Sequence, residues 1–116
     1  MGSNLLVYER RGVRVAVVHG SFDITNATEV GSALRNAARY RSELVVSLNE
    51  CSHIDIDGIA TLLLLHRRMG DRLILVCTPQ RIFEMTGVQK VIRIERTVDD
   101  AVRRLNRDGA GVAAKP

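Results

Sequence analysis

The segment Leu44–Leu48 (LVVSL) constrains the fold more than any other part of the chain. It is apolar at every position except Ser47, which is the pattern of a strand covered on both of its faces. A sheet with two covered faces needs helices on both sides, and amphipathic helical patterns precede and follow this segment. The sequence therefore predicts an α/β fold.

Strand and helix patterns alternate along the chain. Strands are predicted at Asn4–Glu9, Val13–Gly20, Leu44–Leu48, Arg72–Cys77 and Val91–Glu95. Helices are predicted from Asn26, after a turn at Asp55, from Thr78-Pro79 and from Thr97. The order β-β-α-β-α-β-α-β-α predicts a mostly parallel mixed sheet with helices, in which a tight hairpin makes the first strand antiparallel.

Polar residues mark the predicted ends of two helices. Asn26 is placed to cap the first helix, with Glu29 three residues later in a capping box. Thr78 is placed to cap the third helix with Pro79 at its first position, and Gly87 ends that helix.

The turn Asp55-Ile56-Asp57-Gly58 leads directly into an apolar helix. Aspartate side chains accept hydrogen bonds from the free N–H groups of a first helical turn, and their charge suits the positive end of the helix dipole. Gly58 permits a close approach of the backbone. The turn is therefore interpreted first as a helix cap, and a role in binding depends on the helix that follows.

That helix has one apolar stripe and one exposed face. At about 100° per residue, the core stripe contains Ile59, Leu62, Leu65 and Met69. The opposite face contains Ala60, Thr61, Leu64, Arg67 and Arg68. A leucine between arginines on an exposed face favours a docking surface for another protein.

Three predicted features follow the carboxyl ends of strands. They are the loop Gly20-Ser21-Phe22-Asp23, the Asp55 turn and the Thr78-Pro79 corner. In a parallel sheet such loops gather at one end, where binding sites form. We expect Asp23 and the Asp55–Gly58 turn to contribute to one partner-binding surface.

The length of 116 residues predicts a single domain over residues 1–116, with an ordered core at about 5–106 and a flexible tail at 108–116. No apolar run approaches the roughly 18 residues needed to span a bilayer, so membrane insertion is not expected. No signal-peptide pattern precedes the first strand, and a cytoplasmic protein is expected.

The chain carries a net charge of +4, from 17 Lys and Arg against 13 Asp and Glu. This charge favours acidic partners, but the arginines are scattered and aromatic residues are few, so direct nucleic-acid binding is not expected. The oligomeric state is left open.

The two cysteines, Cys51 and Cys77, form no metal-binding signature. No metal and no cofactor are expected. Both cysteines are placed toward the carboxyl end of the sheet, so an oxidative switch between them is kept as a minor hypothesis.

From about residue 5 to residue 106, the chain resembles the STAS domain of anti-sigma factor antagonists. Gly20-Ser21-Phe22-Asp23 resembles the family's Gly-x-hydrophobic-Asp loop before the first helix. Leu44–Leu48, Asp55 and Gly58-Ile59 resemble its strand and its Asp-Ser-Ser/Thr-Gly-Leu turn. The segment from Thr78-Pro79 to Thr86-Gly87-Val88 resembles its late Pro…Thr-Gly-hydrophobic segment.

The resemblance implies a non-catalytic regulator that binds an anti-sigma factor, often a serine kinase, and thereby frees a sigma factor for transcription. In the family, phosphorylation of the hydroxyl residue after the motif aspartate breaks that complex. Here the phosphoacceptor-equivalent position is Ile56, followed by Asp57, and neither is a substrate for a serine kinase. Ser47 stands where the family often has Asp or Asn. The docking surface is kept and the usual switch is lost.

Two alternatives stay open. The family also supplies STAS subunits of bacterial lipid-transport ABC complexes, although those usually keep a hydroxyl residue in the turn. An enzyme using Asp55 and Asp57 with His53 for metal-dependent or acid–base chemistry is the alternative from another class, and the absence of a recognisable nucleophile–base pair argues against it.

Overall fold

The computed structural model describes residues 4–39, 43–78 and 80–113. Within them the strands are β1 Leu5–Arg10, β2 Val13–Val18, β3 Gly20–Phe22, β4 Leu44–Ser47, β5 Cys51–Ile54, β6 Leu73–Val76 and β7 Arg93–Glu95. The α-helices are α1 Ala27–Ala38, α2 Ile56–Met69, α3 Arg81–Thr86 and α4 Val98–Ala113. Short 3₁₀ helices occupy Gly70–Arg72 and Val88–Lys90.

The main sheet has the strand order β1-β2-β4-β6-β7. β1 and β2 pair in antiparallel fashion, and every other pair in this sheet is parallel. The predicted α/β class and mixed sheet are thus confirmed. β3 and β5 form a separate two-stranded parallel sheet beyond the carboxyl ends of β2 and β4.

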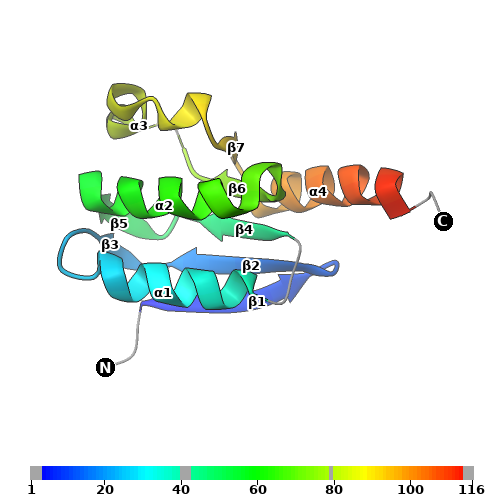
Figure 1. Cartoon of the computed structure of the whole chain (residues 1–116), viewed down its shortest axis with the longest axis horizontal. Helices are drawn as coiled ribbons and strands as arrows, with labels where there is room; N and C mark the ends of the chain where they lie inside the picture. The colour runs from blue at the N-terminus through cyan, green and yellow to red at the C-terminus, as the bar shows by residue number, and fades with distance from the viewer. Residues whose placement is uncertain (1–3, 40–42, 79, 114–116) are drawn as a thin grey trace.

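Helices cover both faces of the main sheet. On one face, Ala16 and Val18 of β2 share a core with residues of α1 and α2. On the other face, Val15 and Val17 pack with Ala101 and Leu105 of α4. This alternation within one strand explains why the central strands are apolar at nearly every position. Figure 1 shows α1 and α2 running side by side on one face of the sheet.

The helices α1 and α2 approach each other closely at Gly31. A Cβ atom at this position would lie 2.8 Å from Cγ2 of Thr61, a distance that side chains do not tolerate. Glycine in the middle of a helix lowers stability by roughly 0.5–1 kcal/mol relative to alanine. The close approach of the two helices explains why glycine is nevertheless present here. Gly31 thereby sets the spacing of the two helices.

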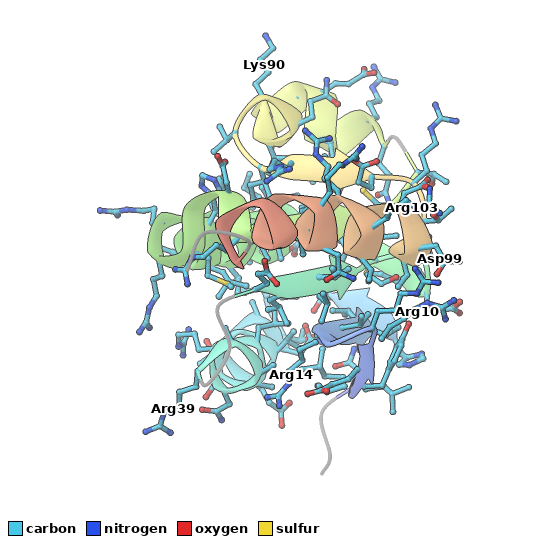
Figure 2. All side chains as sticks on the ribbon, turned by 90° about the vertical axis from the view of Figure 1, so that its right-hand side faces the viewer. Arg10, Arg14, Arg39, Lys90, Asp99 and Arg103 are labelled. Carbon is cyan, nitrogen blue, oxygen red and sulfur yellow. The ribbon has the colours of Figure 1, made fainter. Side chains whose placement is uncertain are left out.

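An ion pair connects the hairpin of β1 and β2 to the helix α4. Nε of Arg10 lies 2.6 Å from Oδ1 of Asp99 (Figure 2). Both side chains are about half exposed, so the pair contributes at most about 1 kcal/mol. Arg11 and Gly12 adopt positive φ angles of 51° and 82° in the turn, as a tight hairpin requires.

Several predicted boundaries are wrong. Gly20–Phe22 is a strand rather than a loop, and the run before Asp55 contains β5. Strands this short contain too few residues for an alternating pattern to be recognised. Their pairing depends on contact between distant segments.

Two predicted caps are also wrong, and in the first the Asn26 side chain bonds within the Asp23 loop instead. Asn26 occupies the N-cap position of α1 but makes no cap hydrogen bond. α3 begins at Arg81 with Gln80 at its N-cap, rather than at Thr78, and Pro79 lies outside the described residues. Gly87 does end α3, in the left-handed conformation.

The last helix extends further than expected. α4 continues to Ala113, into the segment where a tail was expected from residue 108. Adding a residue to an existing helix needs only one further hydrogen bond, whereas starting a helix is costly. Residues 114–116 lie outside the described residues.

Replacing Leu62 with alanine is expected to destabilise the protein by about 2–5 kcal/mol, because its side chain is completely buried and truncation leaves a cavity. Leu64→Ala is the matched control on the same helix. Its side chain is 57% exposed, so a change within about 0.5 kcal/mol is expected. Urea unfolding of both variants measures the difference, and equal losses would contradict the assignment of the two faces.

Candidate functional site

The short strands β3 and β5 bring two distant loops together at one end of the molecule. β3 leads into the loop at Asp23, and β5 leads into the turn at Asp55. Their parallel pairing places Phe22 opposite Ile54, so the two loops leave the small sheet side by side. The expectation that the Asp23 loop and the Asp55 turn share one end of the fold agrees with this geometry.

The side chain of Asp55 connects the two loops. Its Oδ1 accepts hydrogen bonds from the N–H groups of Asp57 at 2.9 Å and Gly58 at 3.2 Å. Its Oδ2 accepts one from the N–H of Ile24 at 3.2 Å. The carboxylate therefore caps α2 and fixes the Asp23 loop at the same time. Helix N-termini favour such a negative charge.

Gly58 is required by the close packing of this junction. A Cβ atom here would lie 2.5 Å from the carbonyl oxygen of Phe22 and 2.8 Å from Cγ1 of Ile54. The nearest atom belongs to the backbone, which cannot move aside as a flexible side chain could. A larger residue therefore does not fit at this position. The glycine in the turn is thus explained by the approach of β3 to α2.

The Asp23 loop is closed by its own hydrogen bonds. Asn26 accepts a hydrogen bond from the N–H of Asp23 at 2.9 Å and donates one to the carbonyl of Ser21 at 2.8 Å. The Asp23 carboxylate accepts bonds from the hydroxyl and the N–H of Thr25. The Thr25 hydroxyl bond lowers the pKa of Asp23, with the nearby His53 adding to the effect. Asp23 therefore keeps its negative charge at neutral pH.

Two large aliphatic side chains project from these loops into solvent. Ile24 is 72% exposed and Ile56 is 59% exposed. They lie close together because the backbone N–H of Ile24 bonds to the side chain of Asp55, the neighbour of Ile56. Exposed isoleucines on adjacent loops cost hydrophobic free energy that a binding partner would recover.

The outer face of α2 continues this surface. Ala60, Leu64, Arg67 and Arg68 are all exposed, as the helical pattern predicted. Thr61 is half-buried, and its hydroxyl donates a hydrogen bond of 2.9 Å to the carbonyl of Asp57. Ile24, Ile56 and Leu64 are called the exposed aliphatic row below.

The STAS domain family model matches residues 4–101 of this chain. The chain is a STAS domain. The predicted resemblance is therefore confirmed. A search of curated proteins finds no match.

Solved structures with the same fold include several anti-sigma factor antagonists. One from Mycobacterium paratuberculosis has 23% identity and a TM-score of 0.77, covering 88% of this chain and 92% of that one. A putative antagonist from Thermotoga maritima has 13% identity and a TM-score of 0.79, covering 88% and 94%. SpoIIAA in its unphosphorylated form has 16% identity and a TM-score of 0.67, covering 88% and 97%. At these identities the likeness shows the fold.

Sequence reasoning missed three residues that the geometry of this STAS domain brings into view. Ile24 joins the exposed aliphatic row, and the signal for it was an apolar residue inside a polar turn. Gly31 and Arg35 of α1 lie beside the outer face of α2. An isolated glycine within a helical pattern was the available signal for close packing there.

The cysteines of this STAS domain are both free thiols. Burial raises the pKa of Cys51, and it raises the pKa of Cys77 to about 11. Thiolates are the reactive form, so both residues react slowly near neutral pH. An oxidative link between them stays a prediction, and their burial argues against it.

Among the described residues, no group of three or more His, Cys, Asp or Glu side chains is placed to hold a metal ion. No described helix has the length and apolar character of a membrane span. The Asp55 carboxylate is engaged by three backbone N–H groups, which supports its interpretation as a cap over a role in catalysis.

Replacing Asp55 with alanine is expected to destabilise the protein by about 2 kcal/mol, because a lost N-cap costs up to about that much and the bond to Ile24 is lost as well. Asp57→Ala is the matched control, since it removes a charge from the same helical turn without removing a cap bond. Its expected cost is about 0.3–1 kcal/mol. Chemical denaturation measures both, and a loss for Asp57→Ala that equals or exceeds the loss for Asp55→Ala would contradict this account.

Proposed function

We propose that this STAS domain is a non-catalytic anti-sigma factor antagonist. It docks an anti-sigma factor of the serine-kinase type in the cytoplasm and so releases a sigma factor for transcription. The observation that carries the proposal is the exposed aliphatic row, which lies on the loops and on the outer face of the helix at one end of the sheet. Exposed large apolar side chains gathered on one surface mark protein interaction sites.

The extent of the matches supports this proposal. An antagonist and a putative antagonist from two organisms share the fold over nearly the whole of both chains. The likeness to the mouse Slc26a9 anion transporter covers 86% of this chain but only 18% of that one, so the match is to one part of a much larger protein.

The surface also supports a defined way of binding. Ile24, Ile56 and Leu64 supply apolar area, and Asp23 and Asp57 supply fixed negative charge beside it. The Asp55 hydrogen bonds hold both loops in place before a partner arrives. A surface that is already ordered loses less conformational entropy on binding.

Regulation differs from the usual switch of the family. Ile56 stands at the position of the phosphoacceptor, is 59% exposed and carries no hydroxyl. SpoIIAA has been solved in both unphosphorylated and phosphorylated forms, and this chain matches both with TM-scores of 0.67 and 0.61. We infer that this protein binds its partner without being switched off at the turn.

Leu64→Asp is expected to weaken binding to the anti-sigma factor by about 1–3 kcal/mol, since buried apolar contacts carry much of the energy of an interface. The fold should be unaffected, because Leu64 is exposed. Leu62→Asp is expected to unfold the domain, since it places a charge in the core. Calorimetry with the purified anti-sigma factor and a melting curve for each variant make the test. A Leu64→Asp protein that melts normally and binds as tightly as the parent rules out this interface.

Incubation with a kinase-type anti-sigma factor and ATP is expected to leave residues 55–58 unmodified, because none of them has a hydroxyl group. Ile56→Ser is expected to accept phosphate and then to lose affinity, since a phosphate adds up to roughly two negative charges beside Asp55 and Asp57. Mass spectrometry locates the phosphate. Phosphate on the exposed Ser52 of the parent protein would show that the switch has moved along the chain.

A further inference from the structure

A groove runs between α1 and α2 on the outside of the molecule. Its volume is about 500 Å³. Leu34 and Leu65 lie beneath it near Gly31 and are almost completely buried, and the exposed Leu64 stands beside it. The close approach of the helices at Gly31 and Thr61 closes one end of the groove. We call this feature the arginine groove because of the side chains at its rim.

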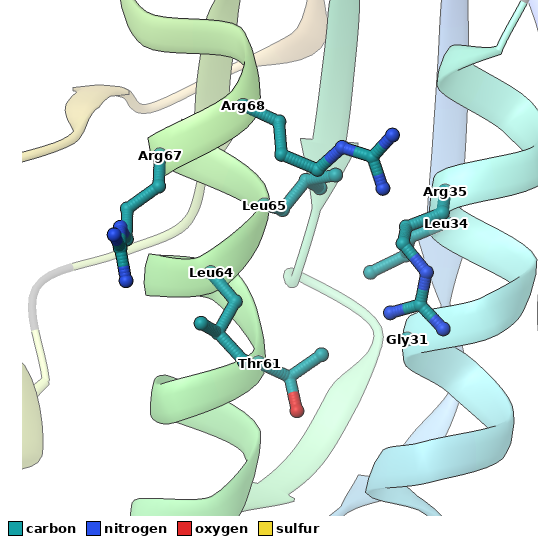
Figure 3. Close-up of a pocket in the computed structure, with 8 residues that line it drawn as sticks. All are labelled: Gly31, Leu34, Arg35, Thr61, Leu64, Leu65, Arg67 and Arg68. Carbon is teal, nitrogen blue, oxygen red and sulfur yellow. The ribbon is translucent and has the colours of Figure 1, made fainter.

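Arginines from both helices flank the groove. Figure 3 shows Arg35 of α1 and Arg68 of α2 reaching into the space between the helices from opposite sides, with Arg67 on the outer side of α2. All three side chains are exposed. In the part of the chain that the structure describes, none of the three forms an ion pair. Ion pairs are present elsewhere, among residues of β1, β2, β7 and α4.

The end of α2 does not require Arg68. Lysine and arginine near a helix C-terminus often bond its last carbonyls. Here Arg72 does so, donating to the carbonyl oxygens of Met69 and Arg68 at 3.1 and 3.2 Å. The backbone N–H of Gly70 bonds to the carbonyl of His66. The carbonyls are thus satisfied, and the guanidinium of Arg68 points into the groove.

The groove is elongated. A second hollow shares Arg35, Leu65 and Arg68 with it and continues to Met69. Thr61 and Met69 are eight residues apart on α2, which is roughly 12 Å or two turns of helix. Paired positive charges along a groove of this length, with the exposed Leu64 at its edge, match an acidic amphipathic helix better than a small anion, which would leave Leu64 uncovered.

We propose that the arginine groove binds an acidic amphipathic helix of the partner protein. Carboxylates of that helix pair with Arg35 and Arg68, and its apolar side chains cover the exposed Leu64. This proposal rests on the function proposed above. The partner would contact the arginine groove, including α1, in addition to the exposed aliphatic row. Guanidinium groups suit this role because they pair with carboxylates in a two-pronged geometry.

The test uses the whole protein and two synthetic helices of about 20 residues, one of leucine and glutamate and one of leucine and glutamine. The glutamate peptide is expected to bind at least about tenfold more tightly, because matched charges steer and hold the complex. Arg35→Glu and Arg68→Glu should each remove that difference. Arg107→Glu on α4 makes the same charge change on the opposite face and should alter binding less than twofold. Melting curves establish that all three variants fold.

Each other outcome overturns the proposal. Equal binding of the two peptides would show that the groove does not require charge on its ligand. An effect of Arg107→Glu as large as that of Arg35→Glu would show that only the net charge of the protein matters. Pyrophosphate and vesicles of anionic lipid serve as competitors. If pyrophosphate displaces the glutamate peptide at a lower concentration than unlabelled peptide does, the groove binds small anions. If the vesicles do so, it binds a membrane surface.

The same variants separate this proposal from the function. If Leu64→Asp weakens binding of the anti-sigma factor while Arg35→Glu does not, the proposed function stands and the groove proposal fails. If neither variant affects binding, the interface at Leu64 fails together with the groove proposal. The proposed function itself fails if the parent protein does not bind the anti-sigma factor.

Discussion

The Asp55 carboxylate is the interaction on which the functional end of this protein depends. One oxygen caps α2, and the other holds the backbone of Ile24. The two loops come from segments about thirty residues apart in the chain, and this bond adds to the short β3–β5 pairing and to the bond from the Asp55 N–H to the carbonyl of Phe22. Gly58 makes the arrangement compact, because a larger residue would collide with the backbone at Phe22.

The same geometry explains why the surface is available for binding. Hydrophobic burial determines the layers, with α1 and α2 on one face of the sheet and α4 on the other. The core stripe of α2 is buried in that packing. Leu64 and the isoleucines that project from the loops remain exposed to solvent. The charge pattern adds to this surface, since Arg35, Arg67 and Arg68 form no ion pair within the described residues.

Under the proposed function, the lack of a hydroxyl group at Ile56 would change the regulation of the domain more than its structure. An isoleucine at the first position of α2 leaves the cap intact, because the capping oxygen belongs to Asp55. The surface can therefore keep its shape while losing the chemistry of phosphorylation. Control of such a protein would rest on its abundance or on its partner. The pKa values of the half-buried Cys51 and the buried Cys77 are both raised, which disfavours their thiolate forms.

The sequence by itself determined the α/β class, the order of the main strands, the two faces of α2 and the cap at Asp55. These follow from local periodicity and from hydrogen bonds within a few residues, which a linear pattern records. Only the tertiary structure decided that Gly20–Phe22 and Cys51–Ile54 are strands, that Asn26 closes a loop rather than capping a helix, and that Arg35 lies across a groove from Arg68. Each of these depends on contact between segments distant in the chain. The free energy of such contacts comes from packing and pairing that no local pattern encodes.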